Sequence, residues 1–366
     1  MKATLFSAIL LAGPLSGAAS QDPVVIPESA VCAECSVRLE RVVSLRDPDG
    51  RAFLSDPQVV VRTRTGEYLV VSGVAQYGFS VFSLTGRFVR RVGRAGRGPG
   101  EYVSILRISV GPADSLFVWD PGAIRMTVLT PEFERAREIA FETPAGRVSR
   151  VGSHYVGAGT SRTAEGEARP LLVFDAGGSL VRSFGGDGGP YDRSNPELHR
   201  RTLSAGDDGS VWAARHAEYL FERWDTLGNL VAAFRREAPW FPPRTRDDPG
   251  SREADGPPQP GLIAVRTVPM DRAWTLSWVA DEEWGDALST VVIQGRARSG
   301  VRREDRSRHR DTVFELLDLA NRRVIGRLRV DELFESFAAP DEVYRYEESA
   351  GGEPVVQIYR LVPGSN

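Results

Sequence analysis

The chain has 366 residues, with 46 basic and 49 acidic side chains and a formal net charge of −3. A weakly acidic chain without a basic domain is a poor binder of nucleic acid, so that class of partner is excluded. Lys2 is its single lysine, which excludes Schiff-base chemistry in a mature protein that has lost its leader. The length suits two ordinary domains or one large radial domain, so length alone does not choose between them.

Residues 1–20 have the pattern of a secretory signal peptide. Lys2 precedes an apolar run that begins at Leu5 and ends near Leu15, and small residues follow before Gln21, where we expect cleavage. The apolar run is shorter than the roughly 20 residues that span a bilayer, and no later segment reaches that length without charges. The sequence therefore predicts an exported protein, periplasmic or extracellular, with no membrane span after cleavage.

The N-terminal segment 21–36 contains a C-x-x-C motif at Cys32 and Cys35. In an exported chain this spacing predicts a local disulfide. A structural zinc site would need two more ligands, and there is no second cysteine pair. A thioredoxin-like centre would need the motif at a helix N-terminus, whereas this region has the pattern of a loop followed by a strand at residues 37–45.

A β-hairpin pattern recurs five times from residue 80 onward. Each copy has two short runs in which apolar and polar residues alternate, joined by a turn. Each is preceded by two further strand-like runs, and four strands in about 47 residues is the size of a propeller blade. The residues just before the five turns are Ser83, Thr130, Asp175, Asp225 and Asp318, at spacings of 47, 45, 50 and 93.

The 93-residue gap predicts one blade with insertions, because it holds a single plausible pair of inner strands, at residues 262–268 and 274–279. Segments 239–260 and 281–310 are rich in turn-forming or charged residues, so we expect both to be insertions.

The last segment supplies strands at residues 342–346 and 355–361. Pairing of residues 355–361 with the strand at residues 37–45 would close a ring and remove its exposed sheet edges. The sequence thus predicts an all-β fold over residues 37–362: a six-bladed β-propeller with four antiparallel strands per blade, closed by an N-terminal strand. Seven blades is the alternative.

The stretch Arg90–Leu129 carries a recognisable motif. A Gly-rich loop ends in Gly100, Glu101 and Tyr102, and an inner strand, a turn, the run SLFVWD and Arg125 follow. This stretch resembles the NHL-like six-bladed propeller proteins of bacteria, and that resemblance implies a fold but no activity. The Gly-rich loop lacks the helix and the Lys-Ser/Thr pair of a phosphate site, so we interpret it as a blade connector.

Arginine occurs on the predicted innermost strand of each of the first five blades. Innermost strands line the channel, and guanidinium groups bind carboxylate, phosphate or sulfate in a bidentate manner, so these residues are candidates for an anion-binding site. The alternative is chance, because arginine is abundant here and only about half of the positions on a strand face the channel. The candidates are Arg62, Arg107, Arg150, Arg201 and Arg266.

No catalytic residue and no cofactor is predicted, because the chain lacks the G-x-S-x-G and H-E-x-x-H patterns of hydrolases. A lactonase-like enzyme could hold Ca²⁺ with oxygen ligands before the fourth blade, although turn chemistry explains the same residues. Those residues are Asp187, Asn195 and Glu197. The histidines are His154, His199, His216 and His309, of which His199 is the one near a predicted innermost strand.

These patterns favour an exported binding or protein-interaction scaffold, whose partner is a small molecule or an envelope protein. The ligand could be anionic, and we expect it at one mouth of the channel, rimmed by the two insertions. The alternative function is that of a metal-dependent lactonase- or lyase-like propeller enzyme.

Overall fold

The computed structural model describes residues 22–364 except residues 53, 163–165, 187–188, 194, 207, 245–255, 294–295, 303–304 and 350. The predicted signal peptide, residues 1–20, therefore lies outside the described residues. Among the residues it does describe, none belongs to a helix with the length and apolarity needed to cross a bilayer.

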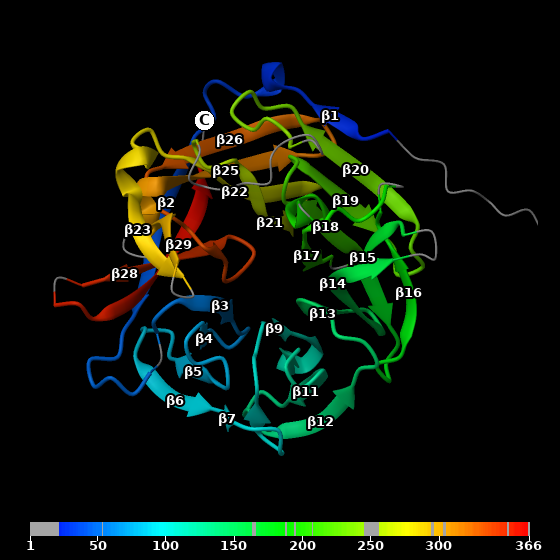
Figure 1. Ribbon diagram of the computed structural model, residues 1–366, viewed down its shortest axis with the longest axis vertical. Coiled ribbons are helices and arrows are strands. Elements are labelled where there is room, and N and C mark those ends of the chain that lie inside the picture. The colour runs from blue at the N-terminus through cyan, green and yellow to red at the C-terminus, as the bar shows by residue number, and fades with distance from the viewer. Residues whose placement is uncertain are drawn as a thin grey trace, which may run out of the picture.

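Six four-stranded antiparallel sheets surround a central axis (Figure 1), so the predicted all-β, six-bladed propeller is confirmed. The first blade is β3 (Pro57–Arg62), β4 (Tyr68–Ser72), β5 (Phe79–Phe82) and β6 (Phe88–Val92). The second is β9 (Arg107–Val110), β10 (Leu116–Asp120), β11 (Arg125–Leu129) and β12 (Arg135–Ala140). The third is β13 (Val148–Val151), β14 (His154–Arg162), β15 (Ala168–Phe174) and β16 (Leu180–Phe184).

The fourth blade is β17 (Arg201–Ala205), β18 (Val211–Arg215), β19 (Leu220–Trp224) and β20 (Leu230–Arg236), with β1 (Val24–Ile26) added in parallel at its outer edge. The fifth is β21 (Gly261–Val268), β22 (Arg272–Ala280), β25 (Arg310–Asp318) and β26 (Arg323–Val330). The sixth is β27 (Ser336–Phe337), β28 (Glu342–Glu348), β29 (Pro354–Pro363) and β2 (Val37–Leu45).

Short elements connect the blades or project from them. Two parallel pieces, β7 (Arg94–Ala95) and β8 (Glu101–Tyr102), lie between the first two blades, and β23 (Leu288–Ile293) pairs with β24 (Arg296–Val301). The helical turns are η1 (Glu28–Ala30), η2 (Pro112–Asp114), η3 (Pro196–His199), η4 (Trp284–Ala287) and α1 (Arg306–His309).

The ring closes by pairing the two ends of the chain. Strand β2 runs antiparallel to β29, with Leu39 opposite Leu361 and Leu45 opposite Val356, as the sequence predicts. Each innermost strand contacts the next around the ring, and β27 contacts β3. The two-residue strand β27 is absent from the sequence-based prediction, because so short a run shows no alternation.

The hydrophobic core is divided among the six interfaces between neighbouring blades. The second strand of a blade is buried on both faces, as in β4, because a blade packs on each side of it. Between the first two blades, for example, Leu69 and Val81 pack against Ile108 and Val118. Outermost strands such as β12 are mostly exposed, which explains their many charged residues.

The motif that carries the family resemblance has a structural role in the connector. Arg125 donates hydrogen bonds to the carbonyl oxygens of Arg97, Gly98 and Glu101, and the Glu101 carboxylate accepts one from the Gly98 amide (2.8 Å). Gly96 has a positive φ, and a Cβ there would collide with the Glu101 carboxylate. The Gly-rich loop is therefore a connector between the first two blades, as predicted.

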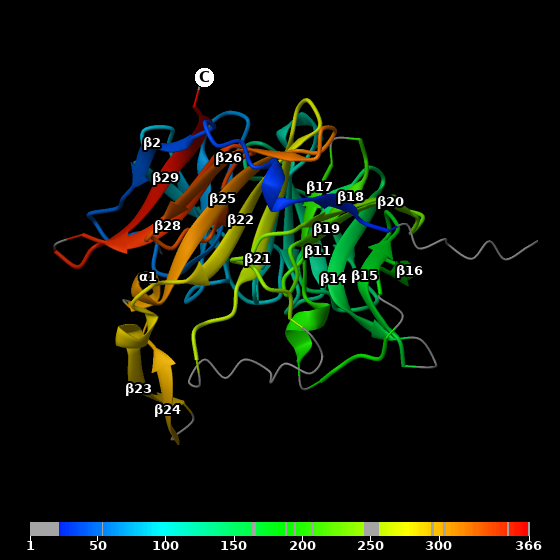
Figure 2. The same ribbon diagram turned by 90° about the horizontal axis from the view of Figure 1, so that it is seen from above.

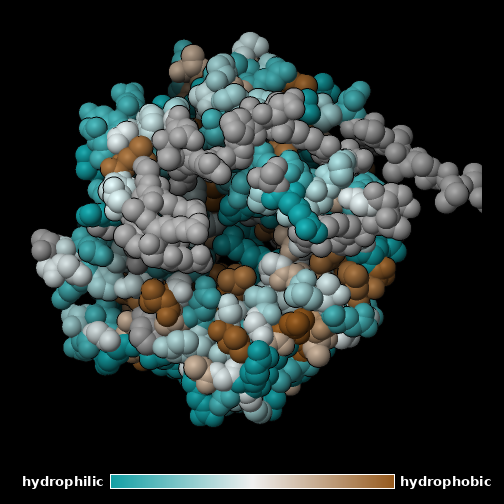
Figure 3. Space-filling model, viewed as in Figure 1, coloured by the Kyte–Doolittle hydropathy of each residue, from teal (hydrophilic) through white to brown (hydrophobic). Residues whose placement is uncertain are grey.

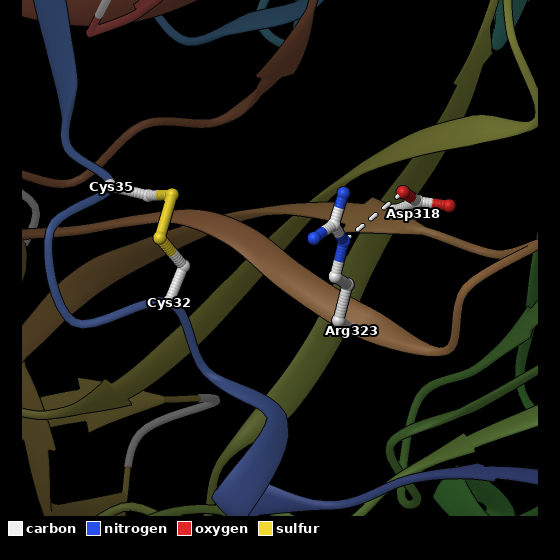
Figure 4. Close-up of a disulfide and its surroundings, with 4 residues drawn as sticks. All are labelled: Cys32, Cys35, Asp318 and Arg323. Atoms are coloured by element: carbon white, nitrogen blue, oxygen red, sulfur yellow. Dashed lines mark hydrogen bonds and ion pairs between the residues drawn. A yellow bond between two sulfur atoms is a disulfide. The ribbon is translucent and has the colours of Figure 1, made fainter. Parts of the chain in front are cut away.

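The N-terminal segment crosses the fourth and fifth blades before it enters the sixth as β2. After β1, Val31 forms a parallel bridge with Val324, and Ser36 forms another with Arg327. Cys32 and Cys35 are joined by a disulfide between these bridges (Figure 4), close to the β25–β26 turn. The segment therefore fastens the fourth and fifth blades to the sixth.

The β23–β24 hairpin projects from one face of the propeller (Figure 2). It belongs to the predicted insertion 281–310, and its root returns through α1 to β25. Of the predicted insertion 239–260, residues 245–255 lie outside the described part of the chain. We call the face with this hairpin the hairpin face.

Candidate functional site

A cavity of about 270 Å³ lies on the propeller axis and receives residues from all six blades. We call it the inner chamber. It opens toward the hairpin face, where the surface is hollowed and hydrophilic at its centre (Figure 3). One lining residue from each blade in turn is Val60, Arg107, Arg147, Arg200, Arg266 and Ser336.

The lining of the inner chamber is strongly basic. Its described residues include five arginines and one carboxylate, Glu335. Two of the arginines are paired: Arg306 with Glu335 (3.1 Å) and Arg200 with Glu197 (3.2 Å). The other three, Arg107, Arg147 and Arg266, form no ion pair with any carboxylate of the described chain.

The charges of Arg147 and Arg266 repel that of Arg107. Burial, followed by the charges of Arg266 and Arg147, lowers the pKa of Arg107. The Arg107 Nε is buried without a hydrogen-bond partner among the described residues. Arg266 has one uncharged partner, the Ser204 hydroxyl at 3.0 Å. The center of the channel thus concentrates positive charge that the described protein leaves uncompensated.

A second cavity, of about 260 Å³, continues the inner chamber toward the hairpin face. We call it the outer chamber. The two cavities share Arg200, His216, Trp278 and Arg306. The outer chamber is also lined by Glu197, Arg244, Val301, His309, Arg310 and Leu333.

His216 lies between the two chambers and is nine-tenths buried. Its Nε2 is 3.3 Å from the Glu197 carboxylate, and its Nδ1 has no hydrogen-bond partner within the described chain. Its ring lies over Gly261, where a Cβ would come within 2.5 Å of the imidazole. Burial and then the charge of Arg200 lower the pKa of His216 to about 4, so it is neutral at pH 7.

Trp278 is the aromatic residue that borders both chambers. Its Nε1 donates a hydrogen bond to the Phe334 carbonyl oxygen (2.7 Å), which fixes the ring. The Arg306 guanidinium lies 5.8 Å from the ring centroid. Trp240, in the first insertion, instead packs on Tyr219 and Phe241, away from these chambers.

The opposite end of the channel holds a third cavity, of about 480 Å³, which we call the far mouth and which is also bordered by Arg107 and Arg266. Its other arginines are largely engaged: Arg62 pairs with Glu342 (2.6 Å) and Arg64 with Asp114 (3.6 Å). Arg150 donates to the Gly152 carbonyl oxygen (3.0 Å). Like the inner chamber, the far mouth is thus lined by three arginines without a carboxylate partner among the described residues, and the two cavities share Arg107 and Arg266.

The far mouth is lined by four of the five arginines proposed from the sequence: Arg62, Arg107, Arg150 and Arg266. Arg107 and Arg266 also line the inner chamber. Arg201 is buried and donates to the carbonyl oxygens of Leu198 and Arg200.

Sequence reasoning missed Arg147, Arg200, Arg306 and His216. Arg147 and Arg200 directly precede β13 and β17, so a search of the connector one residue upstream of each strand would have found them. His216 follows β18 and Arg306 begins α1, and neither position carries a sequence signal for the channel.

The structure describes two of the three alternative Ca²⁺ ligands, Asn195 and Glu197. Asp187 lies outside the described residues, and Asn195 is buried next to η3. Glu197 contacts Arg200 and His216, so its neighbours are basic. No group of three or more metal-ligating side chains occurs among the described residues.

By sequence, residues 58–129 match the model of a family described as a 6-bladed beta-propeller. With the fold above, this confirms that the chain is a six-bladed β-propeller protein, as its resemblance to such proteins implied. No curated protein sequence matches the chain.

Solved structures of propeller proteins resemble it in fold at low identity. A candidate exported protein from Bacteroides fragilis has a TM-score of 0.64 and 10% identity, with 93% of this chain and 100% of that chain covered. A member of the DUF4221 family from Bacteroides vulgatus has a TM-score of 0.62 and 10% identity, at 90% and 99% coverage. Virginiamycin B lyase from Staphylococcus aureus has a TM-score of 0.45 and 10% identity, at 90% and 100% coverage.

Proposed function

We propose that this chain is an exported β-propeller that binds an anionic ligand in the inner chamber. The observation that carries the proposal is the group of three arginines, Arg107, Arg147 and Arg266, that line the chamber without a carboxylate partner among the described residues. Export is supported by the signal-like pattern of residues 1–20 and by the fold it shares with the exported-protein candidate of Bacteroides fragilis.

An anion would relieve the electrostatic cost of this arrangement. Like charges held together in a partly dehydrated cavity repel, and a buried charge without a partner costs several kcal/mol. Guanidinium groups present planar pairs of N–H donors that match carboxylate, phosphate or sulfate oxygens. The ligand-free channel therefore stores a penalty that a bound anion removes. Arg62 and Arg64 add little to this penalty, because Glu342 and Asp114 already pair with them.

Calorimetric titration at low salt tests this proposal, with citrate and sulfate as probes. We expect one saturable site and a rise in melting temperature with either anion. Arg147→Gln should weaken citrate binding about tenfold and leave the melting temperature unchanged, because Arg147 is exposed and forms no ion pair. Arg41→Gln, at an exposed position on β2, is the matched control and should leave binding intact. Absence of saturable binding by both anions would refute the proposal.

Anion binding should be linked to protonation of His216. The charged or titratable groups around this ring are Glu197, Arg200 and Arg244, with Arg306, His309 and Arg310 also lining the outer chamber. Because burial and Arg200 hold the folded pKa near 4, below the ordinary 6.5, the ring is neutral at pH 7. A nearby anion favours the imidazolium and raises that pKa, so binding takes up a proton and strengthens as the pH falls from 7 toward 5.

Sulfate serves as the probe for this linkage because its charge is constant over that pH range. Titrations in two buffers of different ionisation enthalpy should report proton uptake by the wild type, and His216→Gln should abolish it. An equal proton uptake by the variant would assign the linkage to another group.

A further inference from the structure

The inner chamber is lined by uncharged polar side chains as well as by arginines. Among its lining residues, Thr202 and Ser336 have hydroxyl groups that form no hydrogen bond with any described residue, and Gln58 uses its amide nitrogen on Asp56 (3.2 Å) and keeps its amide oxygen available. A compact inorganic anion would be satisfied by the arginines alone. Uncharged donors and acceptors beside the cluster suit a ligand that carries hydroxyl groups next to its anionic group.

Trp278 adds a flat apolar surface at the boundary of the two chambers. The indole N–H, its only hydrogen-bond donor, is already bonded to the Phe334 carbonyl oxygen. The ring can therefore contact a ligand only through apolar contacts of its face and edge. It remains half-buried and borders both cavities, so a ligand that extends from one to the other passes it. Such a surface binds the less polar face of a ring.

The two chambers together have the volume for a ligand of more than one ring. Each encloses about 260 to 270 Å³, and joined they reach the size range of ordinary ligand sites. The outer chamber carries further basic groups, Arg244 and Arg310, so the charge continues beyond Trp278. A ligand that repeats the same combination of ring, hydroxyls and anion along its length fits both.

We infer that the ligand is an acidic oligosaccharide of the uronate class; this inference rests on the proposed anion site. One carboxylate binds Arg107, Arg147 and Arg266, and the hydroxyls of the same sugar bond Thr202, Ser336 and Gln58. A sugar ring stacks on Trp278, and the remaining sugars occupy the outer chamber beside Arg244 and Arg310.

Calorimetry with trigalacturonate, maltotriose and citrate tests the inference. Trigalacturonate should bind about tenfold tighter than citrate, and maltotriose should bind too weakly to measure. Trp278→Leu should remove the preference for trigalacturonate over citrate while citrate affinity stays within about twofold of the wild type. Trp284→Leu, in η4 outside both chambers, is the control and should preserve the preference.

A second variant covers the case in which Trp278→Leu does not fold. Thr202→Val, nearly isosteric, should also weaken trigalacturonate binding and spare sulfate, which carries no alcohol group. If citrate binds as tightly as trigalacturonate in the wild type, or a nucleoside diphosphate binds tighter than both, the saccharide inference is wrong and the anion site stands. If none of the anions binds, the anion site itself is wrong.

Discussion

Replacing Glu315 by glutamine is expected to lower the free energy of unfolding by about 3 to 5 kcal/mol, because it leaves buried arginines without their central counter-charge. Glu315 is fully buried in β25. Its carboxylate accepts hydrogen bonds from Tyr219 (2.7 Å), from Arg236 (3.2 Å) and from Arg327 (2.8 Å). The Arg236 side chain is also fully buried, so the amide of the variant cannot match its charge and water cannot replace it.

The same network ties the N-terminal segment to the ring. The carboxylate of Glu28, in η1, accepts hydrogen bonds from both terminal nitrogens of the Arg327 guanidinium (3.0 Å each) and also contacts Arg236. These arginines come from the fourth and fifth blades, so one cluster joins both blades to the segment that leads into β2. Loss of Glu315 should therefore loosen ring closure as well as the fifth blade.

Urea unfolding of the wild type, Glu315→Gln and Glu40→Gln measures this effect. Glu40 pairs with Arg38 on the exposed surface of β2, and breaking that pair should change the unfolding free energy by less than about 1 kcal/mol. A similarly small change for Glu315→Gln would mean that the buried network contributes little.

The contribution of Glu28 to the stability of this cluster should depend on pH. Hydrogen bonding to Arg327 lowers the pKa of Glu28 below its ordinary 4.5. Its contribution to stability is therefore present above pH 4.5 and is lost as the pH falls through the folded pKa. The difference in stability between the wild type and Glu28→Gln should accordingly vanish in acid.

The fold could be predicted from the sequence because each blade repeats a local pattern. The alternation of apolar and polar residues in the hairpins predicted strands β5, β11, β15, β19 and β25. The number of strands in each blade then assigned β2 to the sixth blade. Strand β27 was not predicted, because a run of two residues shows no alternation of apolar and polar side chains. Blade number followed from the finding of a single inner strand pair, β21 and β22, in the long gap.

The site could be predicted only in part, because a one-residue shift moves a side chain to the opposite face of a strand. Arg200 and Arg201 are adjacent, yet one lines the chamber and the other bonds carbonyl groups behind it. His216 and Arg306 reach the channel from a connector and from an insertion, and the path of these segments depends on tertiary packing. Composition could indicate basic channel residues but not which of them lack a carboxylate.

Arg107→Gln should change binding and stability in opposite directions. Removing the central charge of the cluster takes away a bidentate donor, so citrate affinity should fall about tenfold or more. Burial, followed by repulsion from Arg266 and Arg147, lowers the pKa of Arg107. The same change removes this disfavoured charge, so the ligand-free protein should become more stable by about 1 kcal/mol. Few structural residues stabilise a protein when they are removed, so this combination is diagnostic of a binding site.

Arg201→Gln is the matched control, because Arg201 begins the innermost strand of another blade. It should leave citrate affinity unchanged and lower stability, since its hydrogen bonds to Leu198 and Arg200 are lost. Saturating citrate should then raise the melting temperature of the wild type and of Arg201→Gln by similar amounts, and that of Arg107→Gln by much less. A loss of stability in Arg107→Gln would identify Arg107 as structural, and the charge at the center of the channel would then need another explanation than a ligand.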